Sequence, residues 1–89
     1  MSAPACYTHR MERRIDVRGL SCPAPVVRAG EALAKVDAGV EIVVLADDPF
    51  ATLDLRAYCH AHRHRFVGHR MLGEAIEIRL RKGCGNAVG

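Results

Sequence analysis

The segment EIVVLA at residues 41–46 constrains the fold of this 89-residue chain more than any other feature. After its first residue the run is continuously apolar and mostly β-branched, and it has no alternation between polar and apolar positions. Such a run favours a strand in the middle of a sheet, or one that is buried on both faces. The other segments are therefore interpreted around this strand.

The segments before it predict a strand and then a helix. Residues 13–18, RRIDVR, alternate between charged and apolar side chains, which is typical of a short strand. From Pro23 onward apolar side chains recur at helical spacing, and Pro23 itself suits the first helical position. Residues 37–39 supply a stop, so we expect a helix of about four turns.

The segments after it predict a second helix and a final hairpin. Asp47 or Asp48 can accept a backbone N–H as the N-cap, Pro49 suits the first turn, and the helix should run to about residue 62. At 100° per residue, four side chains form the expected buried stripe: Phe50, Leu53, Ala57 and Ala61. Residues 65–72 and 74–81 read as two strands joined by the turn LGE.

The predicted order is therefore βαβαββ. A right-handed crossover makes the first two strands parallel, and the hairpin completes a mixed four-stranded sheet with both helices on one face. This α/β (α+β) two-layer sandwich leaves the other face of the sheet to water or to a partner. We expect one domain at residues 14–82, with mobile tails at 1–13 and 83–89.

Composition narrows the class of protein. Hydrophobic residues make up 49% and charged residues 26%, the balance of an ordinary globular domain. No apolar run approaches the roughly 18 to 20 residues needed to cross a bilayer, and the first residues lack the apolar stretch of a secretory signal, so we expect a cytoplasmic protein. The net charge of +3 is scattered and aromatic residues are few, which argues against nucleic-acid binding.

Cys22 is the candidate reactive residue. It falls at the predicted N-cap of the first helix, where the peptide dipoles favour an anion, so we expect a thiolate there and an exposed sulfur. Pro23 and Pro25 remove two N–H donors, but they hold the turn in one shape. Pro25 also occupies the place where a thioredoxin-like site has its resolving cysteine, which favours covalent carriage over redox cycling. The alternative is a buried cysteine that packs as a small hydrophobe.

Two motifs carry a resemblance to a known family. DVRGLSCPAP at residues 16–25 resembles the Asp-x-Arg-Gly-Leu-x-Cys-Pro-x-Pro signature of the TusA, or SirA-like, sulfur-carrier proteins, and ADDPFATLDL at 46–55 resembles their second motif. The resemblance spans residues 14 to about 82. It implies the same βαβαββ fold and a sulfurtransferase that acts as a persulfide carrier, without cofactor or metal.

The resemblance also implies partners and roles. The sulfur donor would be a cysteine desulfurase or a rhodanese-like protein, and the acceptor the next protein of a relay for tRNA thiolation, molybdenum-cofactor assembly or sulfur oxidation. Cys22 would bear the sulfur. The residues that shape or position its turn would be Asp16, Arg18, Gly19, Pro23 and Pro25, and those of the second motif Asp48, Pro49 and Asp54. We expect Asp48 and Asp54 to have capping and helix-surface roles, Arg18 to be a solvated arginine, and the carrier to be a monomer.

One departure from the family's pattern concerns the end of the second helix. Members often have Gly just before a His there, whereas Arg63 precedes His64 in this chain, so we expect a less sharp helix end. The cysteine-bearing tails also lie outside the pattern, and Met11 is a candidate functional start.

A cluster of cysteine and histidine gives a rival interpretation. Cys59 is the secondary thiol candidate, expected to be a partly buried structural thiol, and four histidines follow it: His60, His62, His64 and His69. On a helix only His60 and His64 would share a face, and two ligands do not close a zinc site, so no metal site is assigned. A metal or redox sensor remains one alternative function, and a non-catalytic interaction or regulatory module that uses the open sheet face is another.

Overall fold

The computed structural model describes residues 12–83 of the chain. In chain order the elements are β1 (Glu12–Asp16), α1 (Ala24–Ala34), β2 (Glu41–Ala46), α2 (Ala51–His62), β3 (Arg65–Leu72) and β4 (Ala75–Arg81). Cys6, Met11, Cys84 and most of the two predicted tails lie outside the described residues. Within the described residues no helix is both long enough and apolar enough to cross a membrane.

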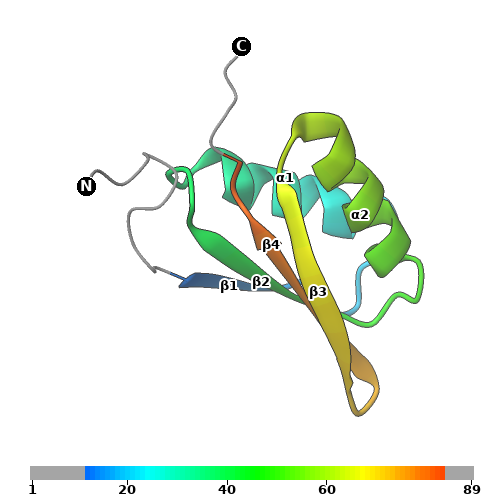
Figure 1. Cartoon of the computed structure of the whole chain (residues 1–89). Helices are drawn as coiled ribbons and strands as arrows, with labels where there is room; N and C mark the ends of the chain where they lie inside the picture. Colours follow the sequence, from blue (N-terminus) through cyan, green and yellow to red (C-terminus); the bar gives the residue numbers. More distant parts are fainter. Residues whose placement is uncertain (1–11, 84–89) are drawn as a thin grey trace.

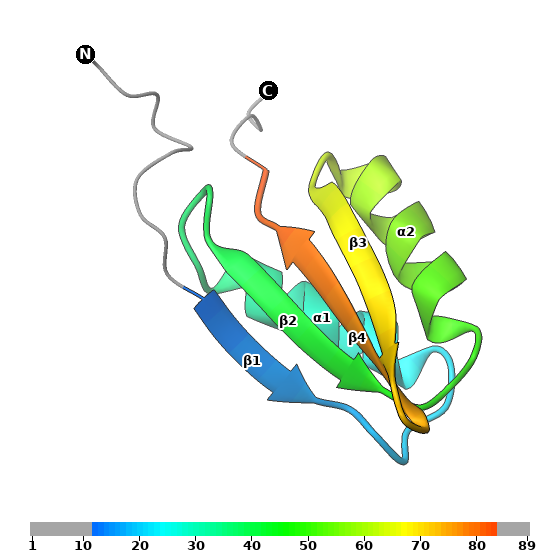
Figure 2. The same ribbon diagram turned by 60° about the horizontal axis from the view of Figure 1, so that its bottom comes forward.

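The strands form one mixed sheet in the order β1-β2-β4-β3. β1 pairs with β2 in parallel, whereas β4 is antiparallel to both β2 and β3. Both helices cover the same face of this sheet (Figures 1 and 2). The βαβαββ two-layer sandwich predicted from the sequence is thus confirmed.

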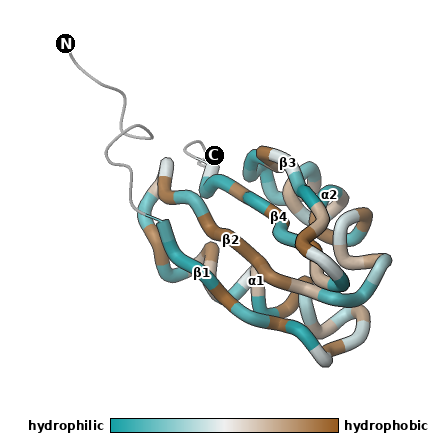
Figure 3. The backbone as a smooth tube through the Cα atoms, turned by 90° about the horizontal axis from the view of Figure 1, so that it is seen from below, coloured by the Kyte–Doolittle hydropathy of each residue, from teal (hydrophilic) through white to brown (hydrophobic). Residues whose placement is uncertain are grey.

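The core lies between the sheet and the helices, with β2 at its centre. As predicted, β2 is an inner strand with a neighbour on each side, and it is largely apolar along its length (Figure 3). The buried cluster consists of Val17, Ala29, Leu33, Ile42, Val44, Ala46, Ala51, Leu55, Cys59, Ile76, Ile78 and Leu80. Burial of these side chains supplies the main stabilisation of the fold, at roughly 25 cal/mol per Å² of apolar surface.

The face of the sheet without helices is covered by an ion-pair layer. Glu77 of β4 is only 3% exposed there, because Arg70 donates to it at 2.8 Å and Arg14 and Arg79 approach it at 3.5 and 3.6 Å. Arg14 reaches Glu77 from β1 and therefore crosses β2, where Val43 is 1% exposed. The apolar stems of long arginine side chains can cover such a residue while their charged ends stay in water.

Helix α1 is shorter than predicted. It has 11 residues, about three turns. Pro23 was predicted to be the first residue of the helix, but it is the N-cap, and the helix begins at the next residue. Cys22 consequently lies just before the cap and not at it. At the other end Lys82 Nζ donates at 2.6 Å to the carbonyl of Leu33 in the last turn of α1, and at 3.2 Å to that of Val36 just beyond the helix, so a cation lies at the helix C-terminus.

The predicted buried stripe of α2 was wrong. The buried residues of the helix are Ala51, Leu55 and Cys59, whereas Phe50 is 62% and Leu53 is 59% exposed. The other two members of the predicted stripe, Ala57 and Ala61, are also exposed. The helix therefore presents to the sheet nearly the opposite side from the one predicted, so that Leu55 faces the sheet and Leu53 faces solvent.

The end of α2 is sharp, contrary to the expectation from Arg63. Arg63 adopts the left-handed conformation with φ 62°, and His64 N–H donates to the Cys59 carbonyl at 2.8 Å. This is the six-to-one hydrogen bond of a Schellman ending, which usually uses glycine. Gly83 packs directly on the Arg63 carbonyl, in a place that leaves no room for a Cβ, and its N–H donates to His64 Nδ1 at 3.0 Å.

Candidate functional site

The candidate site lies at the end of the sheet where both helices begin. Because α1 and α2 each follow one of two parallel strands, their N-termini meet at the carboxyl ends of β1 and β2. Figure 2 shows the β1–α1 and β2–α2 connections and the β3–β4 turn at this same end. Cys22 belongs to the β1–α1 connection and is exposed there.

Two aspartates of the second motif hold the connection that carries Cys22. The Asp47 carboxylate accepts the Gly19 N–H at 3.0 and 3.1 Å, and Asp48 Oδ2 accepts the Cys22 N–H at 2.8 Å. Asp48 Oδ1 also accepts the Phe50 N–H at 2.9 Å, one position before α2. Asp47 or Asp48 was expected to be the N-cap of α2. Asp48 binds the N–H of Phe50, but Phe50 is itself the N-cap, and no side chain caps the helix.

The first motif also contains its own ion pair. Arg18 binds Asp16 through two side-chain hydrogen bonds of 2.9 and 2.7 Å, and its backbone N–H donates to the same carboxylate at 3.0 Å. These hydrogen bonds lower the pKa of Asp16 to about 2. Arg18 is solvent-exposed, as expected, but it is engaged by Asp16. Gly19 has φ 87°, a conformation that side chains disfavour, so glycine suits the turn that follows.

The two prolines differ in their surroundings. Pro23 is exposed beside the sulfur, whereas Pro25 is buried under the first turn of α1. The Cys22–Pro23 peptide bond is cis. Pro49 lies in the exposed turn that leads into α2.

Asp54 forms a hydrogen bond with the sulfur of Cys22. Cys22 Sγ donates to Asp54 Oδ2 at 2.7 Å, across 32 positions of sequence. The hydrogen bond to Asp54, partial burial and the negative charges of Asp54 and Asp48 all raise the pKa of the Cys22 thiol. This direction is contrary to the thiolate expected from the sequence, because the carboxylates of Asp54 and Asp48 favour the thiol form. Asp54 is also more than the helix-surface residue expected from the sequence.

Cys59 lies in a different environment. It is 1% exposed within the core, and burial raises the pKa of its thiol to about 11. Both Cys22 and Cys59 are free thiols. A buried thiol with a raised pKa is chemically inert, so the position of Cys59 indicates a packing role.

Two of the histidines, His62 and His64, lie against the ring of Tyr58 at the end of α2. The ring centroids of Tyr58 and His62 are 4.2 Å apart, and those of Tyr58 and His64 are 6.1 Å apart. His60 and His64 do not share a helix face as the sequence suggested, because α2 ends before His64. Burial, with the positive charges of Lys82 and His62, lowers the pKa of His64. No group of three His, Cys, Asp or Glu side chains within residues 12–83 is arranged to hold a metal ion.

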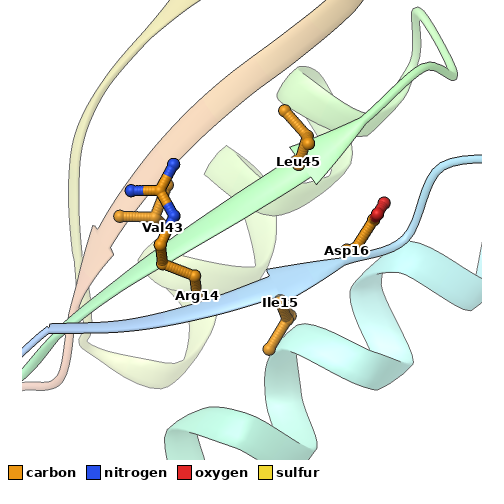
Figure 4. Close-up of a pocket in the computed structure, with 5 residues that line it drawn as sticks. All are labelled: Arg14, Ile15, Asp16, Val43 and Leu45. Carbon is orange, nitrogen blue, oxygen red and sulfur yellow. The ribbon is translucent and has the colours of Figure 1, made fainter.

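A shallow pocket of about 130 Å³ lies on the open face of the sheet. Its lining consists of Arg14, Ile15, Asp16, Val43 and Leu45. Figure 4 shows Arg14, Val43 and Leu45 on that face, whereas Ile15 points towards α1. Neither Cys22 nor Asp54 lines this pocket, and Asp16 is the one residue of the first motif that does.

Sequence reasoning missed the contact of Asp54 with the sulfur and the exposure of Phe50 and Leu53. One signal for Asp54 was available, because it belongs to the second motif together with Asp48. For the helix, the sequence contains a second apolar stripe, Ala51, Leu55 and Cys59, at spacings of four.

Comparison with known proteins connects this site to one family. A family model described as "Sulfurtransferase TusA" matches residues 13–82. The protein YrkF of Bacillus subtilis (strain 168), whose name describes it as a candidate sulfur carrier, is 33% identical over 69 residues. That alignment covers 78% of this chain and 37% of YrkF, so the chain spans little more than a third of this curated relative. The crystal structure of a SirA-like protein from Desulfitobacterium hafniense matches with a TM-score of 0.70 at 27% identity, covering 82% of this chain and 99% of the other.

Proposed function

Since the chain belongs to the TusA family of sulfurtransferases, we propose that it accepts sulfane sulfur on Cys22 as a persulfide and passes that sulfur to another protein. The observation that carries the proposal is the exposed Cys22 thiol, held by backbone and side-chain hydrogen bonds at the end of the sheet where both helices begin. A sulfur in this position can be reached by the active-site cysteine of a donor and later by that of an acceptor.

Each transfer is a thiol–persulfide exchange. Cys22 loses its proton, and its sulfur attacks the terminal sulfur of the donor persulfide. A new S–S bond forms on Cys22, the S–S bond in the donor breaks, and the released donor thiolate takes up a proton. One thiol and one persulfide enter and leave the step, so it needs neither oxidant nor reductant. Transfer to the acceptor repeats the exchange with Cys22 as the donor.

The surroundings of Cys22 support carriage of sulfur over disulfide chemistry. The second thiol of residues 12–83, Cys59, is buried in the core. Pro25 stands where a thioredoxin-like site would have its resolving cysteine. Within this part of the chain, no exposed thiol next to Cys22 can attack the persulfide and form a disulfide.

The proposed partners are a sulfur donor and a sulfur acceptor, both proteins. The donor is a cysteine desulfurase or a rhodanese-like protein, and the acceptor is the next carrier in a relay for tRNA thiolation, cofactor assembly or sulfur oxidation. The proposed site of action is the cytoplasm, where thiols are kept reduced.

The test is a loading experiment on the full chain. We expect incubation with a cysteine desulfurase and free cysteine, without added reducing agent, to increase the intact mass by one sulfur atom. Peptide mapping should place the sulfur on Cys22. The variant Cys22→Ala should lose the adduct, because it lacks the nucleophile.

Matched cysteine variants serve as controls. Cys59→Ala, and a variant with Cys6→Ser and Cys84→Ser, should still gain one sulfur on Cys22. An adduct that persists in Cys22→Ala, or no adduct at all on the unaltered protein, would reject the proposal. In the rival case of a non-catalytic interaction module, Cys22→Ala would leave partner binding and phenotype intact.

A further inference from the structure

Exposed apolar side chains lie at the starts of both helices, at the same end of the sheet as the candidate site. Three of the large exposed hydrophobic side chains lie at the starts of the two helices: Phe50 at 62%, Leu53 at 59% and Val27 at 53% exposure. Phe50 is the N-cap of α2, and Leu53 lies in its first turn beside Asp54. We refer to Val27, Phe50 and Leu53 as the apolar rim.

The packing of the helices brings the two parts of the apolar rim together. Gly30 of α1 lies so close to Tyr58 of α2 that a Cβ on Gly30 would be 2.7 Å from the Tyr58 hydroxyl. One turn nearer to the start of each helix lie Val27 and Asp54. The apolar rim therefore adjoins the carboxylate that binds the Cys22 thiol.

This surface contains carboxylates that lack a cationic partner among the described residues. Within residues 12–83, neither Asp48 nor Asp54 forms a salt bridge; the salt bridges there involve Glu12, Asp16, Glu41 and Glu77 as acids. Arg18 lies in the β1–α1 connection together with Cys22, but its guanidinium group forms a salt bridge with Asp16. The sulfur thus lies in a negatively charged environment.

Contact with an entirely apolar partner surface would be unfavourable for the unpaired charge of Asp54. Such contact removes water from Asp54 and from the sulfur, and a carboxylate that loses water without gaining a positive charge is strongly disfavoured. The attacking form of Cys22 is also an anion, and it would form 2.7 Å from a second anion. A cation supplied by the partner relieves both costs at once.

We propose that the apolar rim and Asp54 form the docking surface for a protein partner that presents apolar side chains around a lysine or arginine, and that this cation pairs with Asp54. The proposal rests on the proposed function and names the chemistry of the partner that delivers or receives the sulfur. A cation paired with Asp54 would weaken the hydrogen bond between Asp54 and the thiol, so the sulfur is more reactive in the complex than in the free protein. Nucleic acid does not fit this surface, because phosphates would face Asp48 and Asp54.

The test uses three small persulfides that share one scaffold and differ in charge. They are the cationic 2-aminoethyl, the neutral 2-hydroxyethyl and the anionic 2-sulfonatoethyl persulfide, applied to the full chain at low ionic strength. The rate at which Cys22 gains one sulfur is followed by intact mass. For the unaltered protein we expect the cationic donor to load Cys22 roughly three- to tenfold faster than the neutral donor, and the anionic donor to be slower by a similar factor.

The matched variants are Asp54→Asn and Asp37→Asn. For each variant we take the ratio of the loading rate with the cationic donor to the loading rate with the neutral donor. This ratio cancels any general change in the reactivity of Cys22. The ratio should fall by about threefold or more in Asp54→Asn, because one unit of charge next to the sulfur is removed. It should stay unchanged in Asp37→Asn, since Asp37 is an exposed acid in the connection between α1 and β2.

A second measurement tests the apolar part of the surface. In Phe50→Ser and Leu53→Ser, loading by the cysteine desulfurase should fall relative to loading by the neutral small persulfide, by roughly tenfold if each side chain is a central anchor of the interface. Small-donor rates that do not depend on charge, or a ratio that Asp54→Asn does not change, would overturn the inference while leaving the proposed function intact. Failure of every donor to load Cys22 would overturn the proposed function itself.

Discussion

At the scale of the residue, the chemistry of Cys22 is set by two opposed electrostatic effects. The start of α1 favours a negative charge, but the first donors of that helix are reduced in number by Pro23 and Pro25. Asp54 accepts a hydrogen bond from the Cys22 thiol at 2.7 Å, and its negative charge adds to that of Asp48. The carboxylates carry full charges at close range, so they raise the pKa of Cys22 and favour its thiol form in the free protein.

The variant Asp54→Asn tests this balance in the absence of any partner. Because Asp54 raises the pKa of Cys22, its replacement should lower that pKa and increase the thiolate fraction at every pH below it. The rate of alkylation of Cys22 by iodoacetamide, followed by peptide mapping, should therefore rise at neutral pH, and its pH profile should move to lower pH. A profile that is unchanged, or that moves to higher pH, would contradict the assigned role of Asp54.

At the scale of the element, α2 shows how a helix serves the core and the site with different sides. Leu55 and Cys59 pack against the sheet, whereas Leu53 and Asp54 belong to the surface around Cys22. Both sides carry a leucine, so they can be compared by the same substitution. Their burial differs completely, because Leu55 is 0% and Leu53 is 59% exposed.

We expect Leu55→Ala to lower the free energy of unfolding by about 2 to 5 kcal/mol, because it removes buried methyl groups and leaves a cavity. Leu53→Ala should change the same quantity by less than about 0.5 kcal/mol, since the side chain is already in water. Urea denaturation of the two variants beside the unaltered protein measures both. Equal losses in the two variants would contradict the orientation of α2.

At the scale of the whole molecule, the two faces of the sheet are stabilised by different means. One face buries apolar side chains under the helices, and the other is covered by arginines that converge on Glu77. Burial alone would raise the pKa of Glu77, but the hydrogen bond from Arg70 and the charges of Arg70, Arg79 and Arg14 lower it below its ordinary value. The charged form of Glu77 is thus favoured by folding.

This shift predicts an acid-dependent part of the stability. A carboxyl group with a lowered pKa in the folded state stabilises the protein above its ordinary pKa, and it loses that contribution as the pH falls through the lowered value. Glu77→Gln should therefore be less stable than the unaltered protein at neutral pH. Its thermal midpoint should also decline less steeply as the pH falls below the ordinary range of glutamate. Parallel pH dependence in the two proteins would contradict the role of Glu77.

Much of the fold could be predicted because it is encoded locally. The β-branched run at 41–46, the alternation in the final strands and the helical spacing after Pro23 each report a local preference, and together they give the βαβαββ order. The errors occurred where the outcome depends on distant contacts. The exposed side of α2 carries Phe50 and Leu53, and only the position of the helix on the sheet shows that Ala51, Leu55 and Cys59 face inward.

The sequence by itself determined the order of the elements, the family and the one cysteine set between glycine and prolines, because propensity and motif spacing are properties of neighbouring residues. The tertiary structure alone decided the ionisation of that cysteine and the surface around it. Cys22 and Asp54 are 32 positions apart, and their contact exists only because two parallel strands bring the starts of both helices to one end of the sheet. Electrostatic interactions depend on distance in space, and the linear sequence does not contain that distance.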